Sequence, residues 1–381
     1  MGSDSDSNFI PNDDRHAGEK LNQKLEKELD SLIARGLADG SFPGAVALVA
    51  GKGKVEYFRT AGRSMLTPED RRMNRDSLFD MASLTKVVAT TPAALQMIDE
   101  GLLSLSDSVA SYFSEFDWSA GNSKATVEDL LCHSSGFPSH YPFYKMVPED
   151  IPVADAVIRT ISGMQPLYEP GKGELYSDID FILLGRIVEK ISGMPLDNYC
   201  RERIFRVLGM KETMFNPPES LKRRFVATEI YPDRIALGTV HDENAFYMKG
   251  IAGHAGLFST TQDLLKYCRA MLDSGSADGG IVISSRSAYE MVRQRRPSIG
   301  GSYGLGWQLN NGQYAGPFGD LFPLWSFGHT GFTGTMIWMD RKSGVASIFL
   351  TNRVHPDRKN VAILRYRRLF NNIVASNLIS D

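Results

Sequence analysis

The chain has 381 residues, of which 42% are hydrophobic and 23% are charged, an ordinary balance for a globular protein with room for two compact lobes. Its formal net charge of −3 gives no bulk attraction to nucleic acid or to an anionic membrane surface. No apolar run approaches the roughly 20 residues that a membrane-spanning helix needs. Three cysteines far apart in the sequence, Cys132, Cys200 and Cys268, argue against a disulfide framework.

The N-terminal residues are polar and acidic, and they lack the basic and apolar regions of a signal peptide. We expect residues 1–16 to be a disordered tail or a remnant of expression. The native compartment therefore stays open. It is periplasmic or extracellular if a leader has been removed, and cytoplasmic otherwise.

The first structured elements are a helix and a hairpin. Apolar residues at helical spacing between Leu21 and Ile33 predict a helix that ends at Gly36 or Gly40. An apolar run, a glycine turn and an alternating run then predict a β-hairpin over residues 45–60.

The middle of the chain has mostly helical patterns. The helices that we expect there are Thr126–Leu131, Val153–Ile161, Ile179–Ile191, Leu196–Val207 and Thr261–Leu272.

Strand-like runs return near the C-terminus. LWSFGHTGFTGTMIWMD and GVASIFLTNR are rich in aromatic and β-branched residues, and a turn over residues 340–344 joins them. YGLGWQ predicts a further short strand, and the pattern from Asp357 onward predicts a final helix. The simplest fold is α/β (α+β): an antiparallel sheet built from both ends of the chain, flanked by the N- and C-terminal helices, with an all-helical lobe inserted.

A Ser-x-x-Lys tetrapeptide, Ser83 to Lys86, lies in the stretch FDMASLTKVVAT. If Ser83 lies in the first turn of a helix, its hydroxyl and the Lys86 ammonium share a face and can meet. A serine becomes a good nucleophile when a nearby base takes its proton, and a lysine can be that base if burial lowers its pKa. The apolar neighbours of Lys86 favour burial, and Pro92 should kink or restart the helix. Taken alone, the tetrapeptide is more typical of a helix cap followed by a solvated lysine.

Tyr176-Ser177-Asp178 comes directly before a strongly amphipathic segment. Ser177 or Asp178 is well suited to cap the helix there. Tyr176 precedes the cap, where its hydroxyl could project into a cleft and shuttle protons. The alternative is an ordinary amphipathic tyrosine.

His329-Thr330-Gly331 lies in a glycine-rich, strand-like run. Glycine in a strand often marks the close approach of another backbone or of a ligand. Thr330 could donate a hydrogen bond to a substrate at such an edge, and the N–H of Phe332 could pair with that of Ser83 as an oxyanion hole. The alternative is a β-bulge with an incidental histidine.

In this order, the three motifs resemble those of the penicillin-recognising serine hydrolases. The nearest likeness is to class C β-lactamases, to D-alanyl-D-alanine carboxypeptidases with a His-Thr-Gly motif and to family VIII carboxylesterases. It covers about residues 21–377 and includes DLLCHSSGFPS, GHAGLFSTTQDLLKYCRAML and YGLGWQ. The resemblance implies a β-lactamase/transpeptidase-like fold, with an α/β lobe over 17–62 and 300–381, a mostly helical lobe over 63–299 and the active site between them.

The resemblance also implies a role for each motif residue. Ser83 matches the acylated nucleophile, Lys86 the group that takes its proton, and Tyr176 the group that passes a proton to the leaving group and helps activate water. The segment His329–Gly331 matches the strand that holds the substrate carboxylate or acyl chain, and the amides of Ser83 and Phe332 match the oxyanion hole. No metal or organic cofactor is expected, and the substrate would be a small molecule or a peptide.

Two residues depart from the usual motifs of the family. Asp178 replaces the common Asn, and a carboxylate cannot donate a hydrogen bond as an amide does. Asp178 could instead pair with Lys86 and keep it charged, which would slow proton abstraction. His329 replaces the Lys that is usual in β-lactamases, and a histidine is only partly charged near pH 7. Both changes favour a peptidase or an esterase over efficient β-lactam hydrolysis.

Ser302 lies in a second serine motif, since Gly300–Gly304 matches the esterase pattern G-x-S-x-G. That pattern needs a strand before it and a helix after it. Here a Ser/Gly loop runs into a strand-like stretch, so we do not expect Ser302 to be the nucleophile.

A cluster of possible metal ligands comprises His241, Asp242, Glu243 and His254. Its spacing fits no standard zinc motif. A structural or cleft-lining loop is the preferred interpretation.

Four aromatic residues, Phe137, Tyr141, Phe143 and Tyr144, lie close together after a predicted helix. They could line an acyl pocket or form a satellite core, and the sequence does not decide between the two.

Three functions are compatible with these observations. The leading hypothesis is a serine hydrolase that acts through an acyl-enzyme on an amide or ester, like a D-alanyl-D-alanine carboxypeptidase or a β-lactamase relative. A carboxylesterase or acyltransferase would use the same serine and lysine. The third possibility, a non-catalytic binding module on this fold, is conceivable because of Asp178.

Overall fold

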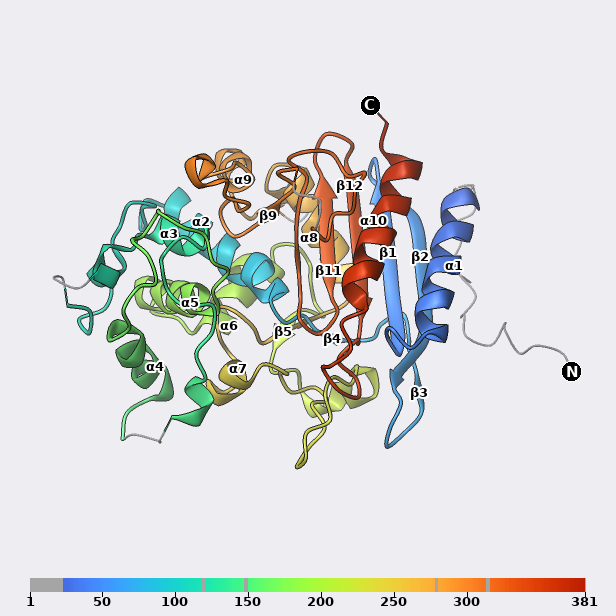
Figure 1. Cartoon of the computed structure of the whole chain (residues 1–381), viewed down its shortest axis with the longest axis horizontal. Coiled ribbons are helices and arrows are strands. Elements are labelled where there is room, and N and C mark those ends of the chain that lie inside the picture. Colours follow the sequence, from blue (N-terminus) through green and yellow to red (C-terminus); the bar gives the residue numbers. More distant parts are fainter. Residues whose placement is uncertain (1–22, 118–120, 147–149, 278–279, 313–315, 381) are drawn as a thin grey trace, which may run out of the picture.

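The computed structural model describes residues 23–117, 121–146, 150–277, 280–312 and 316–380. The tail expected at residues 1–16 lies outside these ranges. Figure 1 shows a sheet with two long helices at one end of the molecule and a mostly helical region at the other. The fold is the mixed α/β arrangement with an antiparallel sheet that the sequence predicts.

The main sheet has seven strands, in the order β3-β2-β1-β12-β11-β10-β9, and every neighbouring pair is antiparallel. Both ends of the chain contribute to it, and they meet where β1 pairs with β12, with Ala45 opposite Thr351. The strands are β1 Gly44–Gly51, β2 Lys54–Met65, β3 Arg71–Arg72, β9 Gln308–Leu309, β10 Phe327–Thr330, β11 Met336–Asp340 and β12 Val345–Thr351.

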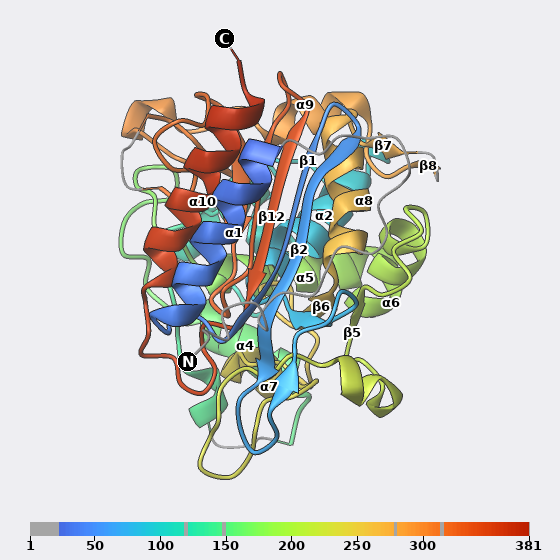
Figure 2. The same ribbon diagram turned by 90° about the vertical axis from the view of Figure 1, so that its right-hand side faces the viewer.

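Helices cover both faces of this sheet. α1 (Gln23–Ala38) and α10 (Ile363–Leu378) pack against each other on one face, in front of the strands in Figure 2. α8 (Thr261–Leu272) contacts β1, β11 and β12 on the other face. β1 and β12 are buried along their whole length because they are central strands covered on both faces, which explains their continuous apolar sequences.

The helical region and the small sheets complete the fold. The three-stranded sheet has the order β4-β6-β5, and its strand β4 leads directly to Ser83. The remaining α-helices and strands are α2 Thr91–Asp99, α3 Val127–Leu131, α4 Val153–Ser162, α5 Asp178–Ser192, α6 Leu196–Cys200, α7 Glu243–Tyr247, α9 Ser285–Met291, β4 Phe79–Asp80, β5 Met214–Phe215, β6 Leu257–Ser259, β7 Ser276–Ala277 and β8 Gly280–Ile281. The 3₁₀ turns are Val109–Ser111, Gly121–Lys124, Phe143–Lys145, Glu219–Arg224 and Pro297–Ile299.

Most predicted elements are confirmed, and the hairpin and the helix over Thr261–Leu272 lie where the sequence placed them. The helix predicted over Leu196–Val207 is α-helical only at its start. α6 ends at Cys200, and a π-helix follows over Arg201–Phe205. The sheet also extends past residue 62, since β2 continues to Met65 and β3 pairs with it.

Two predictions near the C-terminus are corrected. LWSFGHTGFTGTMIWMD forms two strands, β10 and β11, because hydrogen bonds within Gly331–Thr335 turn the chain back on itself. The final helix begins at Ile363 and not at Asp357. The side chains of Asp357 and Asn360 accept hydrogen bonds from backbone N–H groups two residues further on, and such turns compete with a helix.

No helix among the described residues combines the length and the hydrophobicity needed to cross a membrane.

We expect the packing of α1 on the sheet to depend on Leu32, which is fully buried in the core between α1, α10 and the strands. Leu32→Ala should lower the free energy of unfolding by about 2–5 kcal/mol, because the truncation leaves a cavity. Urea unfolding followed by circular dichroism would measure the loss. Lys27→Ala, an exposed change on the same helix, is the matched control and should stay within about 0.5 kcal/mol of wild type. Equal effects of the two variants would contradict the packing described here.

Candidate active site

Ser83 stands at a tight turn between β4 and a helix. The preceding residue, Ala82, has a φ of 45°, a left-handed conformation that is strained for a residue with a Cβ. The buried carboxyl of Asp80 stabilises the turn, because it accepts hydrogen bonds from the N–H of Ala82 (2.8 Å) and the N–H of His241 (2.7 Å). Asp80 carries no sequence signal for this role, since its second partner is distant in the chain.

The helix after Ser83 has two parts. A π-helix runs over Lys86–Thr90, and α2 begins at Thr91 with Pro92 in its first turn. The restart expected at Pro92 is therefore confirmed, and its cause is the missing N–H of proline. π-helical turns are rare and frequently occur at functional sites.

Lys86 is completely buried beside Ser83. Its ammonium donates to Ser83 Oγ at 3.1 Å, to Asp178 Oδ1 at 2.7 Å and to the carbonyl of His254 at 3.2 Å. The serine and the lysine thus meet on one face, as the spacing predicts. The alternative of a solvated lysine does not fit a side chain with no exposed surface.

The ion pair between Lys86 and Asp178 decides the charge state of both groups. Burial alone would lower the pKa of Lys86, but the Asp178 carboxylate outweighs burial and raises this pKa above its usual range. Burial would likewise raise the pKa of Asp178, but the charge of Lys86, helped by its hydrogen bond and by the nearby His140, holds this pKa well below its usual range. Lys86 is therefore charged at neutral pH, as the Asp at this position led us to expect.

Tyr176 packs over the same lysine. The Lys86 ammonium lies 4.8 Å from the centre of the tyrosine ring, close enough for a cation–π interaction. Burial raises the pKa of Tyr176, and hydrogen bonding with Lys86 and Ser83 opposes the rise. The phenol therefore keeps its proton at neutral pH, and it can donate that proton to a leaving group.

Two buried residues, His133 and Asp180, interact with each other next to Tyr176. The His133 ring lies 4.6 Å from the Tyr176 ring, and its Nδ1 accepts a hydrogen bond from the N–H of Ser177. Burial raises the pKa of Asp180 well above its usual range, and its Oδ2 lies 3.1 Å from the same Nδ1. His133 lies in the segment DLLCHSSGFPS, but sequence reasoning assigned it no role.

His329 lies beside Tyr176 with 5.7 Å between the ring centres. Burial, together with the charge of Lys86, lowers the pKa of His329 to about 3. The expectation of a partly charged histidine near pH 7 is therefore wrong: the ring is neutral because it is buried near a cation. A neutral ring gives a substrate carboxylate no ionic attraction.

The turn after β10 packs against the segment that leads to Ser83. Thr333 Oγ1 donates to the carbonyl of Asp80 at 2.8 Å, and Thr335 Oγ1 donates to that of Met81 at 3.1 Å. A Cβ on Gly331 would lie 2.5 Å from the Met81 carbonyl oxygen, so only glycine permits this approach. The close approach predicted from the glycines of this motif is present. Phe332 follows in the turn, with a half-exposed side chain.

The sequence matches the Beta-lactamase family over residues 29–372. The chain belongs to the Beta-lactamase family. A curated relative from Escherichia coli O157:H7, named "Putative D-alanyl-D-alanine carboxypeptidase", is 34% identical over 375 residues, which cover 88% of this chain and 83% of the relative.

Solved structures with low sequence identity have the same fold. A penicillin-binding protein homologue from Caulobacter crescentus has a TM-score of 0.73 at 21% identity, covering 95% of this chain and 99% of the other. EstCE1, a hydrolase with promiscuous acyltransferase activity, has a TM-score of 0.74 at 19% identity, covering 93% of this chain and 99% of its own. The family and its relatives point to a hydrolase of the serine β-lactamase and penicillin-binding type.

His140 is a site residue that sequence reasoning missed. Its Nδ1 lies 3.9 Å from Asp178 Oδ2, and about half of its side chain is exposed. The interaction with the Asp178 carboxylate raises the pKa of His140. His140 lies outside the three sequence motifs, and its contact with Asp178 joins two segments that are distant in the chain.

The candidate metal ligands do not act as one group. His241 bonds Glu229, Glu243 bonds Arg358, and Asp242 caps α7 while it accepts a hydrogen bond from His254 Nε2 at 2.9 Å.

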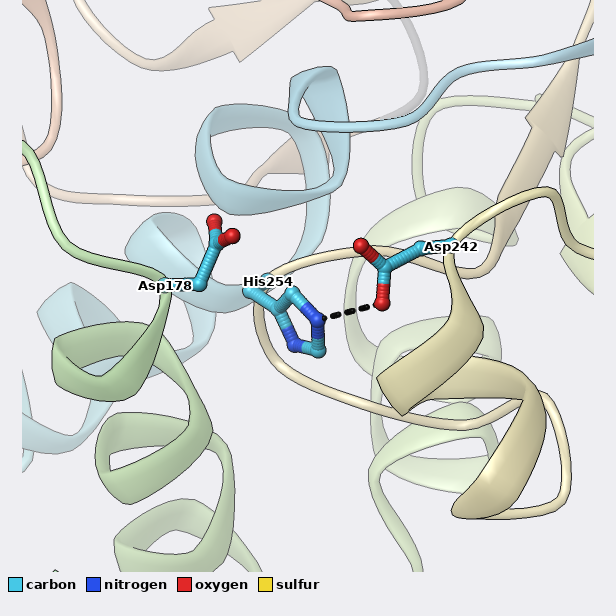
Figure 3. Close-up of side chains that lie close together, drawn as sticks. All are labelled: Asp178, Asp242 and His254. Carbon is cyan, nitrogen blue, oxygen red and sulfur yellow. Dashed lines mark hydrogen bonds and ion pairs between the residues drawn. The ribbon is translucent and has the colours of Figure 1, made fainter. Parts of the chain in front are cut away.

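Asp178, Asp242 and His254 do offer ligand atoms within 4.8 Å of one another (Figure 3). The Lys86 ammonium already binds Asp178 and would repel a cation there. A loop that lines the site remains the preferred interpretation.

The remaining sequence candidates lie elsewhere. Ser302 is in a loop before β9, so it lacks the preceding strand and following helix of an esterase serine. Its hydroxyl and its amide both donate to the Glu174 carboxylate. The aromatic residues Phe137 and Phe143 are core residues, whereas Tyr141 and Tyr144 are partly exposed.

The Lys86–Asp178 pair predicts a change in pH dependence. Asp178→Asn keeps an oxygen for Lys86 but removes the negative charge, so the pKa of Lys86 should fall by about 1–3 pH units. More Lys86 is then neutral at pH 7, and acylation of Ser83 by an activated ester should be faster there. The pH–rate profile of acylation would measure a shift of its rising limb to lower pH.

Asp242→Asn is the matched control for this shift. It removes a nearby carboxylate that bonds His254 and not Lys86, and asparagine also caps a helix well. A profile that moves equally in both variants, or in neither, would contradict a specific effect of Asp178 on Lys86.

Proposed function

We propose that this protein is a serine hydrolase that acts through a covalent acyl-enzyme on an amide or ester. One observation supports this most directly. The Ser83 hydroxyl, half-buried and reachable, lies within hydrogen-bond distance of a buried lysine whose other partners are Asp178 and a carbonyl.

The acylation step uses three side chains. Neutral Lys86 takes the Ser83 proton as Oγ forms a bond to the substrate carbonyl carbon, and the carbonyl oxygen becomes an oxyanion. The N–H groups of Ser83 and Phe332 stabilise that oxyanion. The bond to the leaving group then breaks as Tyr176 delivers a proton to it and recovers one from Lys86.

Deacylation repeats these steps with water. Tyr176 and Lys86 take a proton from the water as its oxygen attacks the acyl carbon, and Ser83 leaves with that proton restored. Only the neutral form of Lys86 can accept the serine proton. The ion pair with Asp178 therefore makes turnover slow at neutral pH and faster in alkali.

The substrate class follows from two observations that point in different directions. Curated relatives carry the name "Putative D-alanyl-D-alanine carboxypeptidase", which favours a peptide that ends in D-alanyl-D-alanine. The neutral His329 supplies no charge for the carboxylate of such a peptide, which favours an ester. We place the carboxypeptidase-like activity first because those relatives span most of this chain, and a short-chain esterase second.

Intact-mass spectrometry would test the acyl-enzyme directly. A fluorescent penicillin, a D-Ala-D-Ala peptide and a short p-nitrophenyl ester form the panel, and at least one should add its acyl mass to wild type but not to Ser83→Ala. Ser302→Ala is the matched control and should be acylated like wild type. Absence of any adduct across the panel would instead favour a binding module. Loss of labelling in Ser302→Ala alone would identify a different nucleophile.

A further inference from the structure

Arg367 of α10 is a buried arginine that contacts the turn between β10 and β11. Its Nη2 donates to the carbonyl of Gly331 at 2.6 Å and to that of Thr335 at 2.8 Å. Only 4% of the residue is exposed, and it forms no ion pair with any carboxylate in the described part of the chain. A cation is thus buried against two backbone carbonyls of the turn.

The Gly331 carbonyl and the Phe332 N–H belong to the same peptide group. We propose that Arg367 is a positioning residue for the oxyanion hole: it orients and polarises the peptide group whose N–H, from Phe332, stabilises the oxyanion. This inference rests on the proposed function, because it assigns the environment of one donor in that reaction.

The physical reason is the coupling between the two ends of an amide. A hydrogen bond to the carbonyl draws electron density from the nitrogen and makes the N–H a stronger donor, and hydrogen bonds in chains reinforce one another in this way. A charged donor has a larger effect than a neutral one, and the low local dielectric strengthens it further. The guanidinium also adds positive potential near the developing negative charge without having to move during the reaction.

The N–H of Ser83, the second donor of the proposed oxyanion hole, also belongs to a peptide group whose carbonyl accepts hydrogen bonds. The N–H of Ser83 shares its peptide group with the carbonyl of Ala82, which accepts hydrogen bonds from Thr85 Oγ1 at 2.6 Å and from the Thr85 N–H at 3.0 Å. Both peptide groups of the proposed oxyanion hole therefore have a carbonyl that accepts hydrogen bonds within the protein.

Arg367 is more than a clamp for the turn. Thr333 and Thr335 already bind the turn to the segment before Ser83, and Arg353 donates to the Phe332 carbonyl at 2.7 Å. A buried cation without a carboxylate is costly, and the Nε of Arg367 has no partner among the described residues. Burial lowers the pKa of Arg367 to about 9, so the group still carries its charge at neutral pH. A structural contact alone would not require that charge.

Arg353 provides a matched control because it contacts the neighbouring peptide group. The Phe332 carbonyl, its acceptor, shares a peptide group with the N–H of Thr333 and not with that of Phe332. Arg353→Met therefore removes a buried arginine that contacts the same turn. It leaves the hydrogen bonds to the Gly331 carbonyl, and hence the polarisation of the Phe332 N–H, unchanged.

The experiment acylates wild type, Arg367→Met and Arg353→Met with an activated ester that has a ¹³C-labelled carbonyl. Difference infrared spectroscopy then measures the acyl carbonyl stretch, which falls in frequency as the oxyanion-hole hydrogen bonds strengthen. Arg367→Met should show a higher stretching frequency than wild type and about 10- to 100-fold slower acylation, with little change in KM. Arg353→Met should keep the wild-type frequency.

Each other result has a defined meaning. If wild type acylates at Ser83 and Arg367→Met has the wild-type frequency and rate, the inference on Arg367 is wrong and the proposed function stands. If the two arginine variants shift equally, the effect belongs to the turn as a whole and the inference is also wrong. If wild type forms no acyl adduct at Ser83, the proposed function fails and the inference fails with it.

A second variant, Arg367→Gln, keeps one hydrogen-bond donor but not the charge, and it gives the same readout if Arg367→Met does not fold. An unchanged carbonyl stretching frequency in Arg367→Gln would overturn the inference.

Discussion

The pairing of β1 with β12 is the constraint on which the rest of the structure depends. It joins the two ends of the chain in one sheet, and it places β11 and β10 next in order. The turn after β10 consequently reaches the segment before Ser83, where Thr333 and Thr335 bind the Asp80 and Met81 carbonyls. Residues from opposite ends of the chain can therefore form one site.

Four charged or neutralised groups give this site its electrostatic character. The buried Lys86 and the partly buried Asp178 form an ion pair in which each stabilises the charge of the other. The same lysine, together with burial, keeps His329 neutral. Arg367 adds a buried cation that donates to two carbonyls of the β10–β11 turn. Burial of charge is costly unless it is paired, so these groups favour a functional interpretation of the region over a purely structural one.

The Asp178 carboxylate pairs with Lys86 at the position where the motifs that the sequence resembles usually have Asn. An amide at that position would leave Lys86 closer to neutrality, whereas the carboxylate keeps it protonated. Neutral His329 removes a second feature that would hold a substrate carboxylate.

The sequence by itself determined the order of the elements, the antiparallel sheet built from both ends, and the spacing that brings Ser83 and Lys86 to one face. The order of the elements and the Ser83–Lys86 spacing depend on local periodicity and on glycine and proline, which act within a few residues. The sheet built from both ends was predicted from strand-like runs at the two ends of the chain, and its pairing of β1 with β12 is a long-range contact. The sequence could not reveal His140, Asp80, the His133–Asp180 pair or Arg367, because each binds a partner that is distant in the chain. It also misjudged His329, since the charge of a histidine depends on burial and on neighbouring charges. Only the tertiary structure decided which of these groups are charged, because desolvation and Coulomb interactions arise when the distant segments pack together.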